Sequence, residues 1–485
     1  MTETRTAPQE TETPATARAA AATSGASEAR FRRRSMWLDL IDEPLVPRAA
    51  LPGPVDVDVA IVGAGFTGLW TAYYLAKADP GLRIAVLEKE IAGFGASGRN
   101  GGWISPFFPA SLETIAKHHG RDQAIAMQRA MFDTVDHIGA TCAAEGIGAR
   151  YHKGGVLNLA TGTGQIARVR EEPDYYHGWG VGKDEIMWLE AAAVRERIVV
   201  DGCLGAMYLR HCACLDPARV ARGLARAVEK LGVTIYEQTP VLSIENGKAV
   251  TAVGEVRAGV VVRGTEGFTP ELPGARRDVI PTYSLMLATE PLPAHFWREV
   301  GWDGRETFSD GRHLYIYAMR TEDDRIALGG RGAPYHFNSK VRDEYEQVPG
   351  VHAILERVLK NLFPAARDAK ITHTWGGSLG IPRDWFPSVG YDKVRGYAWG
   401  GGYVGDGVAA SNLAGRTLGD LITGRESELT ALPWANHHSP KWEPEPLRWL
   451  GVRTSLAIFA SADKREQKTG KPARRAQMMK KVLPI

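Results

Sequence analysis

The sequence predicts an α/β protein in which a discontinuous domain on a parallel sheet is interrupted by an antiparallel-sheet α+β domain. Three observations predict this fold. Residues 57–62 form a β-branched run, followed by a glycine turn, an apolar stretch and a second β-rich run. Residues 214–265 contain a further helix and several short β-rich runs. Segments 155–160 and 282–330 alternate apolar and polar side chains between turn residues, as antiparallel strands do.

The first strand leads into a glycine turn, Gly63-Ala-Gly65-Phe-Thr-Gly68. Gly63 permits a tight turn, Gly65 lets the backbone approach a pyrophosphate, and Gly68 lets the helix pack closely on the strand. Glu88 ends the next strand about 20 residues further on, where a carboxylate can accept hydrogen bonds from an adenosine ribose. This spacing predicts a Rossmann-type dinucleotide site, with a turn that binds no ligand as the alternative. The same stretch provides three further candidate contacts: Phe66, Thr67 and Lys89.

Two more glycine clusters indicate which dinucleotide binds. Residues 93–102 hold five glycines directly after the ribose acid, at the edge of a parallel sheet where ligands bind. A flexible surface loop is the alternative for this cluster. Residues 399–416 form a glycine loop that opens an apolar helix, and a helix N-terminus carries partial positive charge. Such a helix start would stabilise the negative charge of a reduced flavin, whereas a nicotinamide enzyme does not need it.

Nine motifs in order resemble the glycine oxidase/D-amino-acid oxidase (DAO) superfamily of FAD-dependent oxidoreductases, over residues 40 to 430. They include GAGFTG, LEKE, GASGRNGG, DPARV, IPTYSLMLATEPL and GGYVGDGVAASNLAGR. SGRNGG is similar to the gamma-glutamylputrescine oxidase-like branch. The resemblance implies a Rossmann-type FAD-binding domain, an inserted substrate domain, and oxidation of the C–N bond of an amine or amino acid. It also implies these cofactor contacts: Ser97, Gly98, Arg99, Asn100, Gly101, Val241, Gly402, Gly405, Asp406, Gly407 and Val408.

Two departures from the resemblance concern the flavin. Some sarcosine-oxidase-like relatives attach flavin through a cysteine in the C-terminal region. No cysteine follows Cys214 here, so we expect non-covalent FAD. Asp406 stands where several relatives carry histidine, so a proton relay through that histidine is not expected.

The candidate substrate-side residues come from the predicted antiparallel domain and the segment after it. Tyr315 and Tyr317 alternate on one strand and would share a face. Arg331 could hold a carboxylate in bidentate fashion or form a surface ion pair. His373 and Trp375 precede a glycine pair and could approach the flavin, or could be packed structural residues.

The predicted boundaries divide the chain into four parts. Residues 1–35 are polar and should form a disordered tail. Residues 36–105, 200–275 and 372–430 should form the FAD-binding domain. Residues 106–199 and 276–371 should form the substrate domain. Residues 431–485 form a basic extension, expected as a solvated helix or tail, with a partner or membrane-surface contact as the alternative.

Bulk composition excludes several other classes. The net charge of +3 over 485 residues does not suggest nucleic-acid binding, and four cysteines are too few for a disulfide framework. Reduced thiols are expected, with a metal or redox pair at Cys212 and Cys214 as a minor alternative; no metal site is predicted. No apolar run approaches the roughly 18 residues that span a bilayer. Arg32–Arg34 precede acidic residues rather than an export signal, so a cytoplasmic location is expected.

The expected partners are a small amine or amino acid and an electron acceptor. O₂ is the expected acceptor, and a dehydrogenase that reduces a quinone or carrier is the alternative. A nicotinamide-dependent dehydrogenase and a flavin-binding subunit without its own turnover are two further alternatives. The branch resemblance favours an amine over a strict D-amino-acid substrate. No oligomeric state is predicted.

Overall fold

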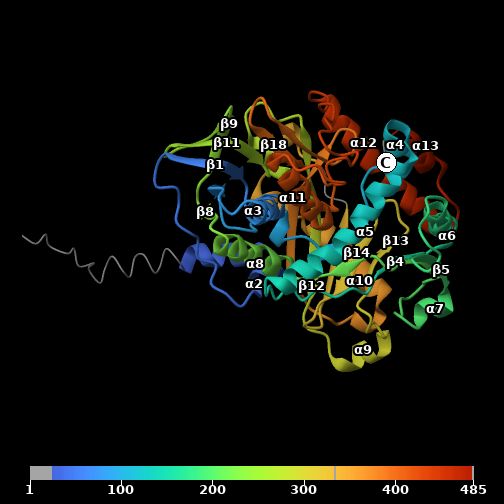
Figure 1. Cartoon of the computed structure of the whole chain (residues 1–485). Helices are drawn as coiled ribbons and strands as arrows, with labels where there is room; N and C mark the ends of the chain where they lie inside the picture. Colours follow the sequence, from blue (N-terminus) through green and yellow to red (C-terminus); the bar gives the residue numbers. More distant parts are fainter. Residues whose placement is uncertain (1–24, 332–334, 483–485) are drawn as a thin grey trace, which may run out of the picture.

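The computed structural model describes residues 25–331 and 335–482, and its strands form two large mixed sheets and one short pair (Figure 1). In the first sheet, parallel pairs join β1 to β2, β1 to β11, β2 to β8 and β11 to β18. The spatial order is β17-β18-β11-β1-β2-β8. Outside this order, β10 pairs with β11, and β9 pairs with β10. Its strands are β1 (Val55–Val62), β2 (Ile84–Leu87), β8 (Thr234–Tyr236), β9 (Val241–Glu245), β10 (Lys248–Thr251), β11 (Glu255–Arg263), β17 (Ser388–Asp392) and β18 (Tyr397–Gly401).

The second sheet has the order β16-β12-β15-β14-β13-β4-β6-β5. Its pairs are antiparallel except for β4 and β13, which run parallel. Figure 1 shows β4, β5 and β13 on the opposite side of the view from β1 and β8. Its strands are β4 (Val156–Leu159), β5 (Ile186–Glu190), β6 (Gly205–Leu209), β12 (Val279–Thr289), β13 (Thr307–Asp310), β14 (Ile316–Arg320), β15 (Ile326–Arg331) and β16 (Ile371–Pro382). The short pair is β3 (Trp103–Ile104) with β7 (Ala213–Cys214).

Strand pairing differs from the predicted boundaries in two places. β6 pairs with β4 and β5, although residues 200–275 were assigned to the FAD-binding domain. β16 pairs with β12 along almost its whole length, although residues 372–430 were assigned to that domain. Both strands therefore belong to the second sheet, because their hydrogen-bonding partners lie there.

The helices cover both sheets. α8 begins as its sequence predicts, with Pro217 at its start and the Asp216 carboxylate accepting a hydrogen bond from Arg219 N at 3.1 Å. Within the described residues, no helix is both long and apolar enough to cross a membrane. From residue 36 onward the α-helices are α2 (Met36–Asp39), α3 (Phe66–Ala78), α4 (Leu112–His119), α5 (Arg121–Ala144), α6 (Thr163–Gly178), α7 (Ala191–Arg195), α8 (Pro217–Lys230), α9 (Ala294–Val300), α10 (Pro349–Leu362), α11 (Gly407–Thr423), α12 (Leu447–Thr469) and α13 (Arg474–Val482).

Close packing of α3 positions the glycine turn. A Cβ atom on Gly68 would lie 2.0 Å from the carbonyl oxygen of Gly63, so only glycine fits there. α11 crosses α3 at Gly415, where a Cβ atom would lie 2.6 Å from that of Trp70. The largest apolar cluster contains α3, α11 and the buried ends of β1 and β2. The turn after β1 is therefore held rigidly at the carboxyl edge of the first sheet.

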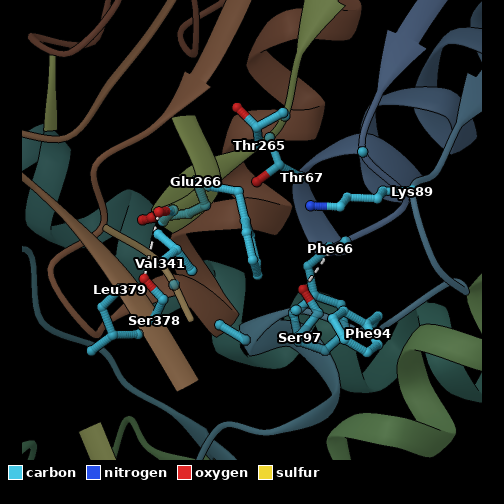
Figure 2. A pocket seen from close by; sticks show the side chains of 18 of the residues that line it. Phe66, Thr67, Lys89, Phe94, Ser97, Thr265, Glu266, Val341, Ser378 and Leu379 are labelled. Atoms are coloured by element: carbon cyan, nitrogen blue, oxygen red, sulfur yellow. Dashed lines mark hydrogen bonds between the residues drawn. The ribbon is translucent and has the colours of Figure 1, made fainter. Parts of the chain in front are cut away.

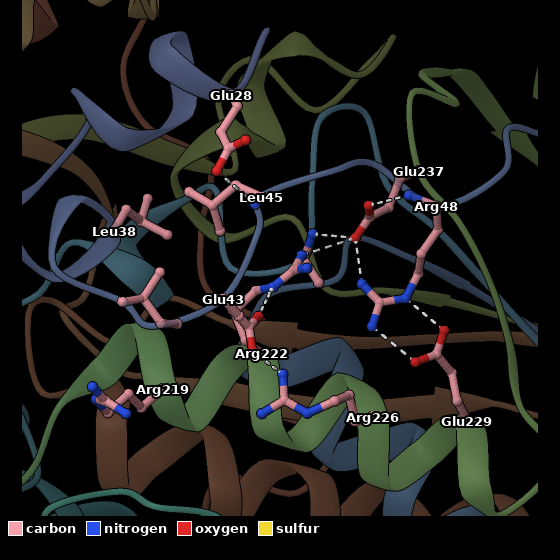
Figure 3. A network of polar contacts seen from close by, with 12 residues as sticks. Glu28, Leu38, Glu43, Leu45, Arg48, Arg219, Arg222, Arg226, Glu229 and Glu237 are labelled. Carbon is pink, nitrogen blue, oxygen red and sulfur yellow. Dashed lines mark hydrogen bonds and ion pairs between the residues drawn. The ribbon is translucent and has the colours of Figure 1, made fainter. Parts of the chain in front are cut away.

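The N-terminal segment corrects the prediction of a tail over residues 1–35. Residues 1–24 lie outside the described part, but residues 25–32 are helical and Phe31 is buried. The segment that follows is held on α8 by ion pairs (Figure 3). Arg222 Nε lies 2.7 Å from Glu43, and Arg48 pairs with the fully buried carboxylate of Glu237 at 2.9 Å. Large apolar side chains between the charged residues explain the order of this segment.

The C-terminal extension is also packed, which corrects the expectation of a solvated helix or tail. α12 contacts α6 and α13. Phe459 and Ala462 on α12 are buried, and so are Ala473 just before α13 and Ala476 within it. The basic residues obscured these apolar positions in the sequence. The four cysteines are free thiols, as expected from the sequence.

Candidate active site

A cavity opens at the carboxyl edge of the first sheet, where parallel sheets bind ligands. Figure 2 shows side chains from distant segments around it, including Thr67, Lys89 and Glu266. The predicted residues on its wall are Gly63, Gly65, Phe66, Thr67, Glu88, Lys89, Ser97, Asn100, Val241, Gly405, Gly407 and Val408. These residues come from three glycine-rich stretches, the end of β2 and strand β9, which the fold brings together.

The glycine turn has the geometry that its sequence predicts. Gly63 has a φ of +102°, and a Cβ atom there would lie 2.8 Å from the carbonyl oxygen of Gly264. A Cβ atom on Gly65 would lie 3.0 Å from Ser97 Oγ. Ser97 Oγ accepts a hydrogen bond from Phe66 N at 2.8 Å, at the first turn of α3. The second glycine cluster therefore lies directly against the start of this helix.

Glu88 lies beside the glycine turn at the end of β2. Its carboxylate accepts hydrogen bonds from Ala64 N at 2.8 Å and Glu90 N at 2.9 Å. Burial raises the pKa of this carboxyl to about 7, although the two N–H donors oppose that shift. Its position at the edge of the cavity suits a contact with a ribose hydroxyl.

Glu266, a half-buried acid on the opposite wall, was not predicted from the sequence. Its carboxylate accepts hydrogen bonds from Gly380 N at 2.6 Å and Tyr403 N at 2.9 Å. Burial raises the pKa of Glu266 to about 7. It therefore fastens β16 to the loop before α11. Gly264 and Gly267 beside it were the only sequence signal for this wall, and they did not identify the acid.

The remaining predicted cofactor residues lie elsewhere. Arg99, Gly101 and Asp406 line a second cavity instead of the first. Gly68, Gly98 and Gly402 are on neither wall. A Cβ atom on Gly98 would lie 2.3 Å from the carbonyl oxygen of Gly93, so this glycine serves packing of the loop.

The second cavity adjoins the first and extends over the second sheet. Both are lined by Ala96, Asn100, Leu379, Gly405 and Val408. The second cavity is rich in aromatic side chains, contributed by Trp103, Phe107, Tyr175, Tyr176, Tyr315 and Tyr317. The two cavities therefore meet where the second and third glycine clusters come together.

The structure brings only some of the predicted substrate-side residues to this cavity. Tyr315 and Tyr317 line it, and Tyr317 Oη lies 2.5 Å from Ser284 Oγ. The side chain of Arg331 lies outside the described residues.

His373 and Trp375 line neither cavity, which favours the alternative that they are packed structural residues over an approach to the flavin. His373 Nε2 lies 3.1 Å from Asp39, and Trp375 Nε1 donates to Arg99 O at 2.7 Å. They lie toward the other end of β16, whereas Gly377–Leu379 reach the cavities.

Charged side chains also line the second cavity. Three of its arginines have carboxylate partners: Arg99 with Glu346, Arg168 with Glu466, and Arg312 with Asp310. Two further carboxylates, Glu172 and Asp406, lie on the wall, and Glu172 accepts a hydrogen bond from Asn158 at 2.7 Å. The described wall thus combines aromatic rings with carboxylates.

Comparison with known proteins identifies the class. The sequence model of the family described as FAD dependent oxidoreductase (DAO) matches residues 58–421, most of the chain. The chain therefore belongs to this family, and FAD is its cofactor. The resemblance stated from the sequence motifs is confirmed.

Particular relatives support the same assignment. The chain is 29% identical over 400 residues to gamma-glutamylputrescine oxidoreductase of Escherichia coli (strain K12), covering 81% of this chain and 89% of the relative. It is 25% identical over 387 residues to glycine oxidase of Bacillus licheniformis, covering 76% of this chain and 93% of the relative. The solved structure of glycine oxidase from Geobacillus kaustophilus has a similar fold, with a TM-score of 0.66 and 22% identity, covering 79% of this chain and 99% of that chain.

Proposed function

We propose that this FAD-dependent oxidoreductase oxidises the C–N bond of a primary or secondary amine to an imine, which water hydrolyses. The observation that supports this most is the junction of the two cavities at Asn100, Leu379, Gly405 and Val408. FAD, when bound, supplies the acceptor for the hydride equivalent removed from the carbon next to nitrogen. The names of the relatives, which include an amine and an amino-acid enzyme, support the same substrate classes.

The first cavity would hold FAD through its main chain. Gly63, Gly65 and the start of α3 suit the pyrophosphate, because the backbone is open there and the helix N-terminus favours anions. Glu88 would accept hydrogen bonds from the ribose, and Val241 would contact the adenine. The start of α11 at Gly407 suits the pyrimidine edge of the flavin. The other FAD contacts predicted from the sequence are likewise proposed as contacts with the cofactor.

The second cavity would hold the amine. Its aromatic rings can enclose the alkyl part of a substrate and exclude water. Carboxylates favour a cationic ammonium group, and aromatic faces attract cations as well. Glu172 and Asp406 therefore suit recognition of an amine as it enters, and Tyr315 and Tyr317 would orient it. The substrate must then lose a proton before its C–N bond is oxidised.

An α-amino acid is the second candidate substrate, and Arg331 would hold its carboxylate unless it forms a surface ion pair instead. The acceptor is proposed to be O₂, with a quinone or carrier as the alternative. The cytoplasmic location predicted from the sequence also stays a prediction.

Anaerobic bleaching tests the proposal. A panel of amines and amino acids is mixed with purified holoprotein without oxygen, and the flavin absorbance is followed. We expect amines to bleach the flavin. No bleaching by any amine would contradict the amine proposal, and bleaching by amino acids alone would favour the second candidate. Peroxide release compared with dye reduction then separates an oxidase from a dehydrogenase.

A further inference from the structure

The outer wall of the second cavity comes from two segments that are distant in sequence. α6 contributes Arg168, Glu172, Tyr175 and Tyr176. Residues 310–315, which run from the last residue of β13 to the start of β14, contribute Arg312 and Tyr315. Both segments contact the C-terminal helices, which lie beyond the family match that ends at residue 421.

One carboxylate on α12 joins these segments. Glu466 Oε2 lies 2.7 Å from Arg168 Nη2 on α6, and Glu466 Oε1 lies 3.0 Å from His313 Nε2. Glu466 Oε1 also accepts a hydrogen bond from Ala473 N at 2.9 Å, just before α13. The Glu466 side chain is 4% exposed, so these interactions lie away from solvent. A single side chain thus connects α6, the 310–315 segment and α13.

A second acid on α12 holds the same segment by its backbone. Asp463 accepts hydrogen bonds from His313 N at 2.8 Å and Leu314 N at 2.9 Å. The ring of Phe459 stacks on His313 with centroids 5.9 Å apart. Glu466, Asp463 and His313 lie close together, as the ligands of a metal ion would. Backbone N–H groups donate to both carboxylates, so ion pairs and hydrogen bonds are enough to explain why these three residues lie together.

We propose that Glu466 and Asp463 are positioning residues for the substrate cavity. They fix α6 and the 310–315 segment, and through them the side chains that line the outer wall. Arg168 connects the cavity wall directly to α12. It lines the cavity, pairs with Glu466 and donates a hydrogen bond from Nε to Gly311 O at 2.6 Å. The part of this inference that concerns amine binding rests on the proposed function. The part that concerns the order of the wall does not.

Loss of the Glu466 carboxylate should weaken substrate binding more than cofactor binding. Arg168 would lose its partner beside the cavity, and a mobile cation there would oppose an ammonium substrate. The FAD cavity shares no described residue with this group.

Glu185 offers a matched control. Its carboxylate also pairs with an arginine, a histidine and a backbone N–H: Arg129 at 2.7 Å, His211 at 2.7 Å and Gly182 N at 2.6 Å. Glu185 is not among the residues that line either cavity. Replacing it removes the same kinds of interaction, and none of these three partners lines either cavity.

The experiment compares Glu466→Ala with Glu185→Ala, using an amine that bleaches the wild-type flavin. In Glu466→Ala we expect KM to rise about tenfold, with kcat changed less than about threefold and the flavin content unchanged. In Glu185→Ala we expect a near-normal KM. An unchanged KM in Glu466→Ala, or an equal rise in both variants, would overturn the proposal.

Hydrogen exchange of the holoprotein provides a readout that needs no substrate. In Glu466→Ala, the amides of residues 310–315 and α6 should exchange faster, whereas those of β1 and β11 should not. If Glu466→Ala folds poorly, His313→Gln and His313→Ala replace it. Glutamine keeps an N–H donor for Glu466 and should preserve the protection that alanine loses. Unchanged exchange in the alanine variants would overturn the proposal, whereas inactivity of the wild type with every amine would contradict only the proposed function.

Discussion

The two cavities are built in different ways. The first cavity, proposed to hold FAD, uses main chain at several points of its wall: the tight turn at Gly63, the open approach at Gly65 and the starts of α3 and α11. The substrate cavity is formed by side chains from β3, α6, the β13–β14 connection and the loop before α11. A backbone site requires particular residues at fixed spacing, whereas a side-chain site allows many residues at each place. The cofactor is therefore shared across the family, while the substrate can differ.

A substitution at Gly65 tests the main-chain site most severely. Gly65→Val should leave the protein colourless, because a side chain would fill the space needed by the pyrophosphate and approach Ser97. We expect FAD affinity to fall at least about 100-fold, or about 3 kcal/mol. Flavin absorbance after purification and titration with FAD measures this.

Gly53→Val is the control for Gly65→Val, since a Cβ atom at Gly53 meets no atom within 4 Å. Circular dichroism checks that both variants are folded. Normal flavin content in Gly65→Val would contradict the proposal that the glycine turn contacts the cofactor.

A substitution at Glu172 tests the side-chain site. Glu172→Gln keeps an acceptor for Asn158 but removes a negative charge from the cavity wall. We expect KM for an amine to rise about tenfold, or about 1.4 kcal/mol, with FAD content unchanged. Steady-state kinetics at low salt measures the change.

Glu190→Gln, which alters the exposed pair with Arg170, should leave KM within about twofold of the wild type. If Glu172→Gln has the same KM as this control, the amine does not depend on the Glu172 charge.

The smallest expected effect concerns the contact between α5 and the helices of the flavin region. His137 Nε2 lies 3.0 Å from Tyr74 Oη on α3, which accepts a hydrogen bond from Asn412 on α11 at 2.9 Å. Burial lowers the pKa of His137 to about 4. His137 in the unfolded chain takes up a proton near pH 6.5, whereas in the folded protein it does so only near pH 4. Protonation therefore favours the unfolded chain, and the contribution of His137 to stability is lost as pH falls from 6.5 toward 4.

His137→Gln should therefore lose less stability than the wild type between pH 7 and pH 5. Urea unfolding of both holoproteins at the two pH values measures the difference. An equal loss of unfolding free energy in both proteins would show that His137 does not make stability depend on pH in this range.

The sequence predicted the main-chain site more fully than the side-chain site. Gly63, Gly65, Glu88 and Ser97 lie on the wall of the first cavity because strand, turn and helix fix their relative places. His373 and Trp375 line neither cavity, because the neighbouring glycines indicate close packing without showing which end of β16 faces the cavities. Glu266 was missed because its donors, Gly380 N and Tyr403 N, come from segments more than a hundred residues away.

The same reasoning explains the two ends of the chain. Apolar residues such as Phe31 and Phe459 are sparse among charged ones, so local composition suggested solvated segments. Phe31 packs against Phe94 and Phe459 stacks on His313, and these partners are distant in sequence, so only the fold brings them together.

A matched pair of substrates tests the central claim most directly. Lysine differs from cadaverine by one α-carboxylate, so the pair isolates how the cavity responds to that group. The holoprotein is mixed with each compound without oxygen, and the rate of flavin bleaching is compared. We predict that cadaverine bleaches the flavin at least about tenfold faster than lysine. Equal or faster bleaching by lysine would contradict an amine-selective cavity.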